Sequence, residues 1–136
     1  MPRKTILLNA LSPEVQARFR SKPKAEKRSA EGTRIAIFKQ LLTERQLPQP
    51  HTEYRFHDTR MWRFDYAWPA WNLALEVDGA IWVAGRHTRG AGWLKDTEKL
   101  NCAASMGWRM LRCSPQMLCT EEFLGTLRAA LNWHPK

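Results

Sequence analysis

Apolar residues recur along the chain with two different periods, and the period predicts whether a segment is a helix or a strand. Every third or fourth residue is apolar over residues 33–46, which predicts an amphipathic helix that ends before the sequence LPQP. The same spacing predicts a second helix over residues 93–106, stopped by Gly107 in the manner of a C′ glycine. A Ser-Pro pair opens a third helix over residues 114–131, with Ser114 as the N-cap and proline at the first helical position.

Between the first two helices, apolar residues alternate with polar ones, which is typical of strands. Strands are expected over residues 53–57, 60–68 and 73–78, with the turn Pro-Ala-Trp-Asn before the third, and a fourth strand over residues 108–113. The expected order is helix, three antiparallel strands, helix, strand and helix. The step from the third strand to the fourth predicts a right-handed crossover, so the sequence predicts a single-domain α/β fold with a mixed sheet.

The turn Pro-Ala-Trp-Asn predicts how the second and third strands pair. A hairpin centred in this turn sets Asp65 directly opposite Glu76 and Arg63 opposite Asp78. Because side chains alternate along a strand, these four residues share one face with two alanines, whose small side chains leave room above the carboxylates. The opposite face is expected to be wholly apolar, with Trp62, Phe64, Tyr66, Trp68, Leu73, Leu75 and Val77.

Two carboxylates placed opposite each other repel, and a bound cation relieves this repulsion. Asp65 and Glu76 therefore form a candidate site for a hard divalent ion such as Mg²⁺ or Mn²⁺, held through carboxylates, a backbone carbonyl and water. Such an ion polarises a phosphate oxygen and lowers the pKa of a bound water, which are two requirements of phosphodiester hydrolysis. The alternative is an ordinary solvated sheet face with an Arg63–Asp78 ion pair, and the hairpin alone leaves both interpretations open.

The charge of the chain adds a candidate ligand. The 136 residues carry a formal net charge of +9, and residues 1–50 hold most of this excess, with 11 lysines and arginines against 4 acids. A basic arm is typical of nucleic-acid binders, so residues 1–30 are expected to form a mobile arm on DNA and residues 31–136 the folded domain. A solvated leader that only keeps the protein in solution remains the alternative.

Other classes of protein are disfavoured by what the chain lacks. No apolar run approaches the roughly 20 residues of a membrane span, and the first residues lack the long apolar region and cleavage site of a signal peptide. The three cysteines form no CxxC pair, which favours free thiols in a reducing compartment. A cytoplasmic protein without a membrane partner is expected, and its oligomeric state stays open, a homodimer included.

The acidic hairpin also resembles a known motif. RFDYAW, LALEVDG and GWRMLRCSPQML are similar to the PD-(D/E)XK nuclease superfamily, and more narrowly to its branch of very-short-patch-repair-like endonucleases and phage Holliday-junction-resolvase-like nucleases. The similarity covers roughly residues 31–131. It implies a restriction-endonuclease-like αβββαβ core and a metal-dependent DNA endonuclease, with Asp65 and Glu76 as metal ligands. The superfamily's lysine, two positions after the second acid, is here Asp78, and Phe64 replaces the motif's proline.

The missing lysine leaves the catalytic cation to be found elsewhere. Lys99, on the polar face of the second helix, is the first candidate, and His87 is the second because histidine acts as an acid or a base near neutral pH. Asp78 is expected either to add a third carboxylate to the metal or to pair with Arg63. Further basic residues are expected to contact the DNA backbone, namely Arg86, Arg89, Lys95, Arg18, Arg20, Lys22, Lys24, Lys27 and Arg28.

Two functions fit these features. The first is a Mg²⁺- or Mn²⁺-dependent endonuclease of a phage or a bacterium, acting in the bacterial cytoplasm, with branched or otherwise distorted DNA as a candidate substrate. The second is a non-catalytic DNA- or RNA-binding protein on a decayed nuclease scaffold, which the missing lysine suggests. Cleavage of DNA in the presence of the metal distinguishes them.

Overall fold

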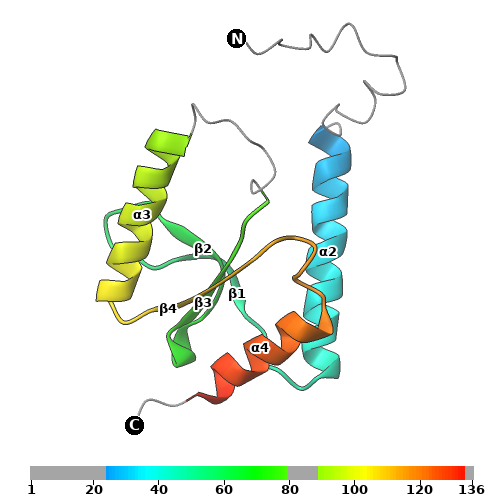
Figure 1. Ribbon diagram of the computed structural model, residues 1–136. Coiled ribbons are helices and arrows are strands. Elements are labelled where there is room, and N and C mark those ends of the chain that lie inside the picture. The colour runs from blue at the N-terminus through cyan, green and yellow to red at the C-terminus, as the bar shows by residue number, and fades with distance from the viewer. Residues whose placement is uncertain (1–23, 80–88, 134–136) are drawn as a thin grey trace, which may run out of the picture. The chain divides into compact units, whose positions relative to one another are not determined.

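The computed structural model describes residues 24–79 and 89–133 of the chain (Figure 1). The described elements are α2 (Lys24–Glu44), β1 (His51–Arg55), β2 (Arg63–Trp68), the 3-10 helix η2 (Pro69–Trp71), β3 (Leu73–Val77), α3 (Arg89–Ser105), β4 (Arg109–Cys113) and α4 (Glu121–Asn132). The order of helices and strands is the one that the sequence predicts, and the protein is of the α/β class. No helix in these two ranges is both long and apolar enough to cross a membrane.

The chain divides into two compact units, Met1–Thr33 and Arg34–Lys136, and the sheet, α3 and α4 belong to the second. α2 begins at Lys24, whereas the apolar pattern predicted a helix from residue 33 and a mobile arm before it. The earlier start has a simple cause, because residues 24–31 are mostly Ala, Lys, Arg and Glu, which favour helices without any apolar periodicity.

The four described strands form one mixed sheet in the order β1-β2-β3-β4. β1 pairs antiparallel with β2 and β2 antiparallel with β3, while β4 runs parallel to β3. α3 lies between β3 and β4 in the chain, so it belongs to the crossover that two parallel neighbours require. The coarse prediction of an α/β fold with a mixed sheet is therefore confirmed.

The β2–β3 hairpin has the predicted register. Tyr66 pairs with Leu75, and the pairing continues without a slip to the turn. The turn is the short helix η2, and Asn72 follows it in the left-handed conformation with a φ of 48°. The N–H of Asn72 donates to the carbonyl of Pro69 at 3.0 Å. Asparagine adopts this backbone conformation more readily than most residues, so the turn suits its sequence.

Helices cover both faces of the sheet, with α3 on one side and α4 on the other (Figure 1). One core cluster joins β2 and β3 to α2 and α4, and its buried members are Phe38, Leu42, Tyr66, Trp68, Leu73, Leu75, Cys113, Leu118, Phe123, Leu124, Leu127 and Leu131. The second cluster includes α3, and its buried members are Phe56, Phe64, Ala67, Ala74 and Ala103. Ala67, Ala74 and Ala103 are all fully buried. The space that the two small alanines of the hairpin were expected to leave is therefore occupied by α3.

β2 changes the direction of its side chains at Asp65. Phe64 lies in the α3 cluster and Tyr66 in the other, although residues two apart in a regular strand face the same side. On β1, Glu53 lies between the residues that pair with Phe64 and Tyr66, and its φ is 49°. The expectation that Trp62 and Phe64 share one apolar face with Tyr66 is therefore wrong, because the sheet is irregular at this point.

α3 starts earlier than predicted and ends as predicted. It begins at Arg89, four residues before the expected start at residue 93. Gly107 follows its last turn with a φ of 88°. The N–H of Trp108 donates to the carbonyl of Ala103 at 3.0 Å, which is the bond that closes a helix through a left-handed C′ residue.

α4 starts later than predicted, at Glu121 rather than Ser114. Ser114 caps only a local turn, accepting a bond from the N–H of Met117 at 3.3 Å. The N-cap is Thr120, whose hydroxyl accepts from the N–H of Phe123 at 3.3 Å. Two glutamates in the first turn add favourable charge at the helix N-terminus, so the second capping signal sets the start.

Candidate functional site

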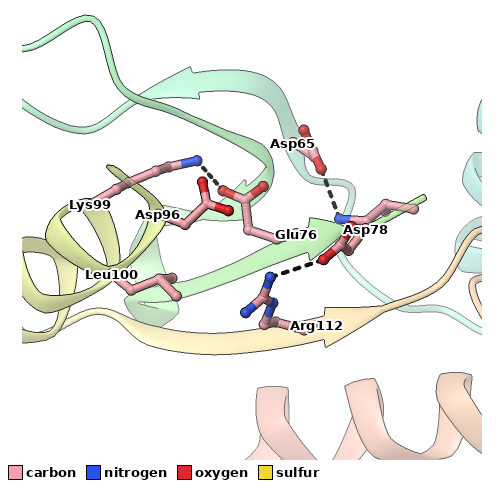
Figure 2. Close-up of a pocket in the computed structure, with 8 residues that line it drawn as sticks. Asp65, Glu76, Asp78, Asp96, Lys99, Leu100 and Arg112 are labelled. Carbon is pink, nitrogen blue, oxygen red and sulfur yellow. Dashed lines mark hydrogen bonds and ion pairs between the residues drawn. The ribbon is translucent and has the colours of Figure 1, made fainter. Parts of the chain in front are cut away.

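A pocket of about 240 Å³ is formed between β3, β4 and α3 (Figure 2). It is lined by four acids, two cations and two aliphatic residues, namely Asp65, Glu76, Asp78, Asp96, Lys99, Arg112, Val77 and Leu100. The acids outnumber the cations, so the pocket is formally negative. It brings together four residues that the sequence nominated for catalysis, which are Asp65, Glu76, Asp78 and Lys99.

Asp65 lies at the irregular point of β2 and turns its carboxylate towards β3. Its Oδ2 atom accepts a hydrogen bond from the backbone N–H of Val77 at 2.7 Å (Figure 2). The regular pairing of β2 with β3 ends at Tyr66 and Leu75. The Asp65 carboxylate therefore accepts a hydrogen bond from a backbone N–H that lies just beyond the paired residues. The bond holds the Asp65 carboxylate close enough to Glu76 to influence its pKa.

Glu76 is largely buried and forms an ion pair with Lys99, with 17% and 18% of the two side chains exposed. Its pKa is raised from 4.5 to about 7, chiefly because burial disfavours the charged form. The hydrogen bond from Lys99 lowers the pKa, and the negative charge of Asp65 raises it again. Such perturbed carboxylates are common in functional sites, although structural ion pairs show them too.

Lys99 reaches the pocket from α3, next to Asp96 and Leu100 on the same side of the helix (Figure 2). One turn further on, Ala103 is fully buried against the sheet, which holds this side of α3 towards β3. The ammonium of Lys99 also lies 5.6 Å from the centroid of the Phe64 ring, an arrangement that favours the cation. Lys99 is therefore held between a carboxylate and an aromatic face.

Asp78 is paired with Arg112 and not with Arg63. The Nη2 atom of Arg112 donates to Oδ2 of Asp78 at 3.1 Å, and the Asp78 N–H donates to the carbonyl of Cys113 at 2.8 Å. The expected Arg63–Asp78 pair is wrong because β4 lies beside β3 and brings its own arginine to Asp78. Arg63 instead pairs in register with Arg55 on β1 and is exposed.

The expected DNA-contacting residues are described only in part. Lys95 is exposed on α3 outside the pocket lining, and Arg28 is exposed on α2. The remaining candidates lie outside the described residues or have side chains that are not described, namely Arg18, Arg20, Lys22, Lys24, Lys27, Arg86 and Arg89. The catalytic candidate His87 also lies outside the described residues.

The sequence did not single out two pocket residues, Asp96 and Arg112. Asp96 precedes Lys99 by three positions on α3, so helical spacing alone put the two on neighbouring positions of one side. Arg112 is the Cα partner of Glu76 in the parallel β3–β4 register. Finding Arg112 required the register between two strands far apart in the chain, for which the sequence carries no local signal. Among the described residues, no three His, Cys, Asp or Glu side chains form a group that could hold a metal ion.

Comparisons with known proteins identify relatives without a known activity. No protein-family model matches the chain, and no solved structure matches it significantly. Two curated proteins from two strains of Mycobacterium tuberculosis are each 34% identical to the chain over 67 residues, and both are named as uncharacterized proteins. The match covers 48% of this chain and 23% of each relative, so the chain spans about a quarter of the length of these relatives.

Proposed function

We propose that this protein is a metal-dependent endodeoxyribonuclease that hydrolyses phosphodiester bonds in DNA. The observation that carries the proposal is the convergence of Asp65 from β2, Glu76 from β3 and Lys99 from α3 in one pocket. Two carboxylates are suited to hold a divalent metal, and a nearby cation is suited to stabilise the negative charge that develops during phosphodiester hydrolysis. The αβββαβ order also agrees with the restriction-endonuclease-like core that the resemblance implies.

Asp65 and Glu76 are the residues that would hold the metal. Their carboxylates lie close enough for Asp65 to raise the pKa of Glu76, and a divalent cation would relieve this repulsion. Mg²⁺ is commonly bound through one or two carboxylates with water completing the shell, so this pair fits the ion without a third acid. When bound, Mg²⁺ or Mn²⁺ would supply polarisation of the phosphate and a more acidic water.

Lys99 would replace the lysine of the superfamily motif, whose position is occupied by Asp78 in this chain. Its ammonium is already inside the pocket, paired with Glu76 and resting near the Phe64 ring. A cation there attracts the phosphate and stabilises the negative charge that develops as the bond breaks. A lysine on α3 thus supplies the same charge from a different position in the sequence.

The first test is cleavage of plasmid DNA with Mg²⁺, Mn²⁺ or EDTA. The wild-type protein should nick or cut in either metal and not in EDTA, and Asp65→Asn and Glu76→Gln should each abolish cutting. Glu98→Gln is the matched control, because Glu98 is an exposed acid of α3 outside the pocket lining. Circular dichroism establishes that each variant is folded. Full activity of Asp65→Asn in Mg²⁺ would overturn the site.

The alternative is a DNA- or RNA-binding protein without catalysis, which the replacement of the motif lysine by Asp78 favours. Such a protein would shift nucleic acid in a gel and leave it uncut under every metal tested. Labelled linear, nicked, four-way-junction and single-stranded DNA, used side by side, separate the two functions and identify the preferred substrate. Preference for the junction would support the branched-DNA substrate.

A further inference from the structure

The pocket contains two ion pairs that differ in their access to solvent. Glu76 and Lys99 form the inner pair, with 17% and 18% of their side chains exposed. Asp78 and Arg112 form the outer pair, with 36% and 51% exposed. Figure 2 shows the Arg112 side chain rising from β4 towards Asp78, on the opposite side of Glu76 from Lys99. A ligand that enters from solvent therefore has better access to the outer pair.

An exposed ion pair contributes little to the stability of a fold, so stability alone does not account for the pairing of Asp78 with Arg112. Arginine carries five N–H donors in a planar fork that matches the oxygens of a phosphate. Only Nη2 of Arg112 has a partner among the described residues, and that partner is Asp78. The guanidinium is thus oriented by one bond while its other donors remain available to a ligand.

Arg112 also lies in the right place to meet a phosphate. It is the parallel Cα partner of Glu76, and neighbouring strands lie about 4.8 Å apart. A phosphate at the inner carboxylates therefore lies within the reach of an arginine side chain. The pocket lining has four acids, and DNA is an anion, so an accessible cation is needed where the substrate enters.

We propose that Arg112 binds a nonbridging phosphate oxygen of the DNA backbone, and that Asp78 is the residue that orients Arg112 and is not a metal ligand. This inference rests on the proposed nuclease function and names how the same pocket recognises the substrate. One expectation for Asp78 was that it adds a third carboxylate to the metal. We assign it a positioning role instead, because its carboxylate is paired with Arg112.

The test measures DNA binding without cleavage, by fluorescence anisotropy of a labelled duplex in EDTA and in Ca²⁺ over a range of salt. Arg112→Gln should weaken binding and flatten the log–log salt dependence by about 0.9, the effect of removing one phosphate contact. Arg128→Gln is the matched control, because it removes the same charge from an exposed position on α4. Equal effects of the two variants, or an unchanged slope in Arg112→Gln, would overturn the phosphate contact.

Arg112→Lys separates charge from geometry. This variant should keep the salt slope, because one cation remains, and should lower kcat/KM for cleavage, because lysine lacks the planar fork. A Lys variant that cuts as fast as the wild type would exclude an oriented contact. Folding of both Arg112 variants is checked by circular dichroism and thermal melting.

Asp78 is tested by two readouts: Mn²⁺ affinity distinguishes a positioning residue from a metal ligand, and coupling to Arg112 distinguishes it from a residue with a structural role alone. Calorimetric titration with Mn²⁺ should give the same affinity for Asp78→Asn as for the wild type, whereas Asp65→Asn should abolish binding. The effect of Asp78→Asn on DNA affinity should differ about threefold or more between the wild-type and Arg112→Gln backgrounds, as expected for coupled neighbours. Loss of Mn²⁺ binding in Asp78→Asn, or additive effects, would overturn the positioning role.

The two proposals fail in different ways. If the wild type never cuts DNA but Arg112→Gln still flattens the salt slope, the nuclease function is wrong and the phosphate contact stands. If the wild type cuts in Mg²⁺ and Arg112→Gln binds DNA like the wild type, the nuclease function stands and the assignment of Arg112 is wrong.

Discussion

Glu76 carries a carboxylate whose charged form is disfavoured in the folded protein. Its carboxylate is buried beside Asp65, and the hydrogen bond from Lys99 offsets only part of the resulting rise in pKa. A nearby cation stabilises a buried carboxylate of this kind, and in the proposed function that cation is a divalent metal. The same property makes the stability of the protein depend on pH.

The first prediction concerns that dependence. The pKa of Glu76 is about 7 in the folded protein and near 4.5 when unfolded, so folding takes up a proton between these values. Its contribution to the free energy of unfolding is therefore present below about pH 4.5 and is lost as the pH rises to about 7. Relative to the wild type, Glu76→Gln should gain stability over this range by up to about 1.4 kcal/mol per pH unit.

Urea unfolding without metal, at pH values from 5 to about 8, measures this difference. Glu98→Gln controls for the removal of an acid from the surface, and the stability difference between this variant and the wild type should stay nearly constant. A constant difference for Glu76→Gln as well would contradict the raised pKa.

A second prediction at the residue scale separates two lysines of α3. Lys99→Ala should lower the single-turnover cleavage rate by at least about tenfold, because it removes a cation held in the pocket. Lys95→Ala removes the same charge one turn away, from an exposed position, and should affect DNA affinity more than the rate. His87→Ala belongs in the same series as the second candidate. Near wild-type rates for all three variants would mean that the carboxylates act without a separate cation.

At the scale of elements, the positions of α3 and α4 depend on their terminal residues. α3 carries Lys99 and Asp96, and its end is determined by Gly107, whose φ of 88° is unfavourable for any residue with a Cβ atom. α4 begins at the cap Thr120, which replaces the Ser-Pro signal six residues earlier. The start of α4 was open to two capping signals, Ser114 and Thr120. The end of α3 requires a residue with a positive φ, and Gly107 is the residue there that suits it.

The third prediction tests the end of α3. Gly107→Ala should lower the free energy of unfolding by about 1 kcal/mol, because alanine is strained in the left-handed conformation although no atom blocks its Cβ. Gly125→Ala is the matched control, since Gly125 lies within α4 with open space around the added methyl group. The control should gain up to about 1 kcal/mol. Chemical unfolding of both variants measures the difference, and equal changes would contradict the strain at Gly107.

At the scale of the whole molecule, the excess positive charge and the acidic pocket lie in different parts of the sequence. Residues 1–50 hold 11 cations against 4 acids, whereas the pocket residues belong to the segment from β2 to β4. If the leader binds DNA, it supplies affinity that the negative pocket does not. In that case the basic N-terminal residues would bind the DNA backbone, and the pocket would carry out the hydrolysis.

The fourth prediction follows from this division. Removing residues 1–23 keeps α2 whole and deletes five cations, Arg3, Lys4, Arg18, Arg20 and Lys22. DNA affinity should fall, and the log–log salt slope should flatten by about 0.9 for each phosphate that the leader no longer binds. The full chain with these five residues changed to Gln controls for length. An unchanged slope in both would identify the leader as a tail that does not bind DNA.

Local chemistry made parts of the structure predictable from the sequence. The Pro-Ala-Trp-Asn turn determined the hairpin register, and the apolar spacing predicted α3 as a helix, although it put Lys99 on the polar face and not towards the sheet. Gly107 determined where α3 ends, because few residues accept a positive φ. Each of these features depends on residues close together in the chain, so a single sequence contains the information.

Tertiary structure decided the rest. The change of faces at Asp65 arises where β1 and β2 are irregular together, and the partner of Asp78 comes from β4, 34 residues further along the chain. Such contacts follow from which strands become neighbours and in which register, and no local pattern encodes them. The sequence by itself therefore determined the two carboxylates and the lysine as candidates, and the packing of β4 and α3 on the sheet decided which cation stands beside each acid.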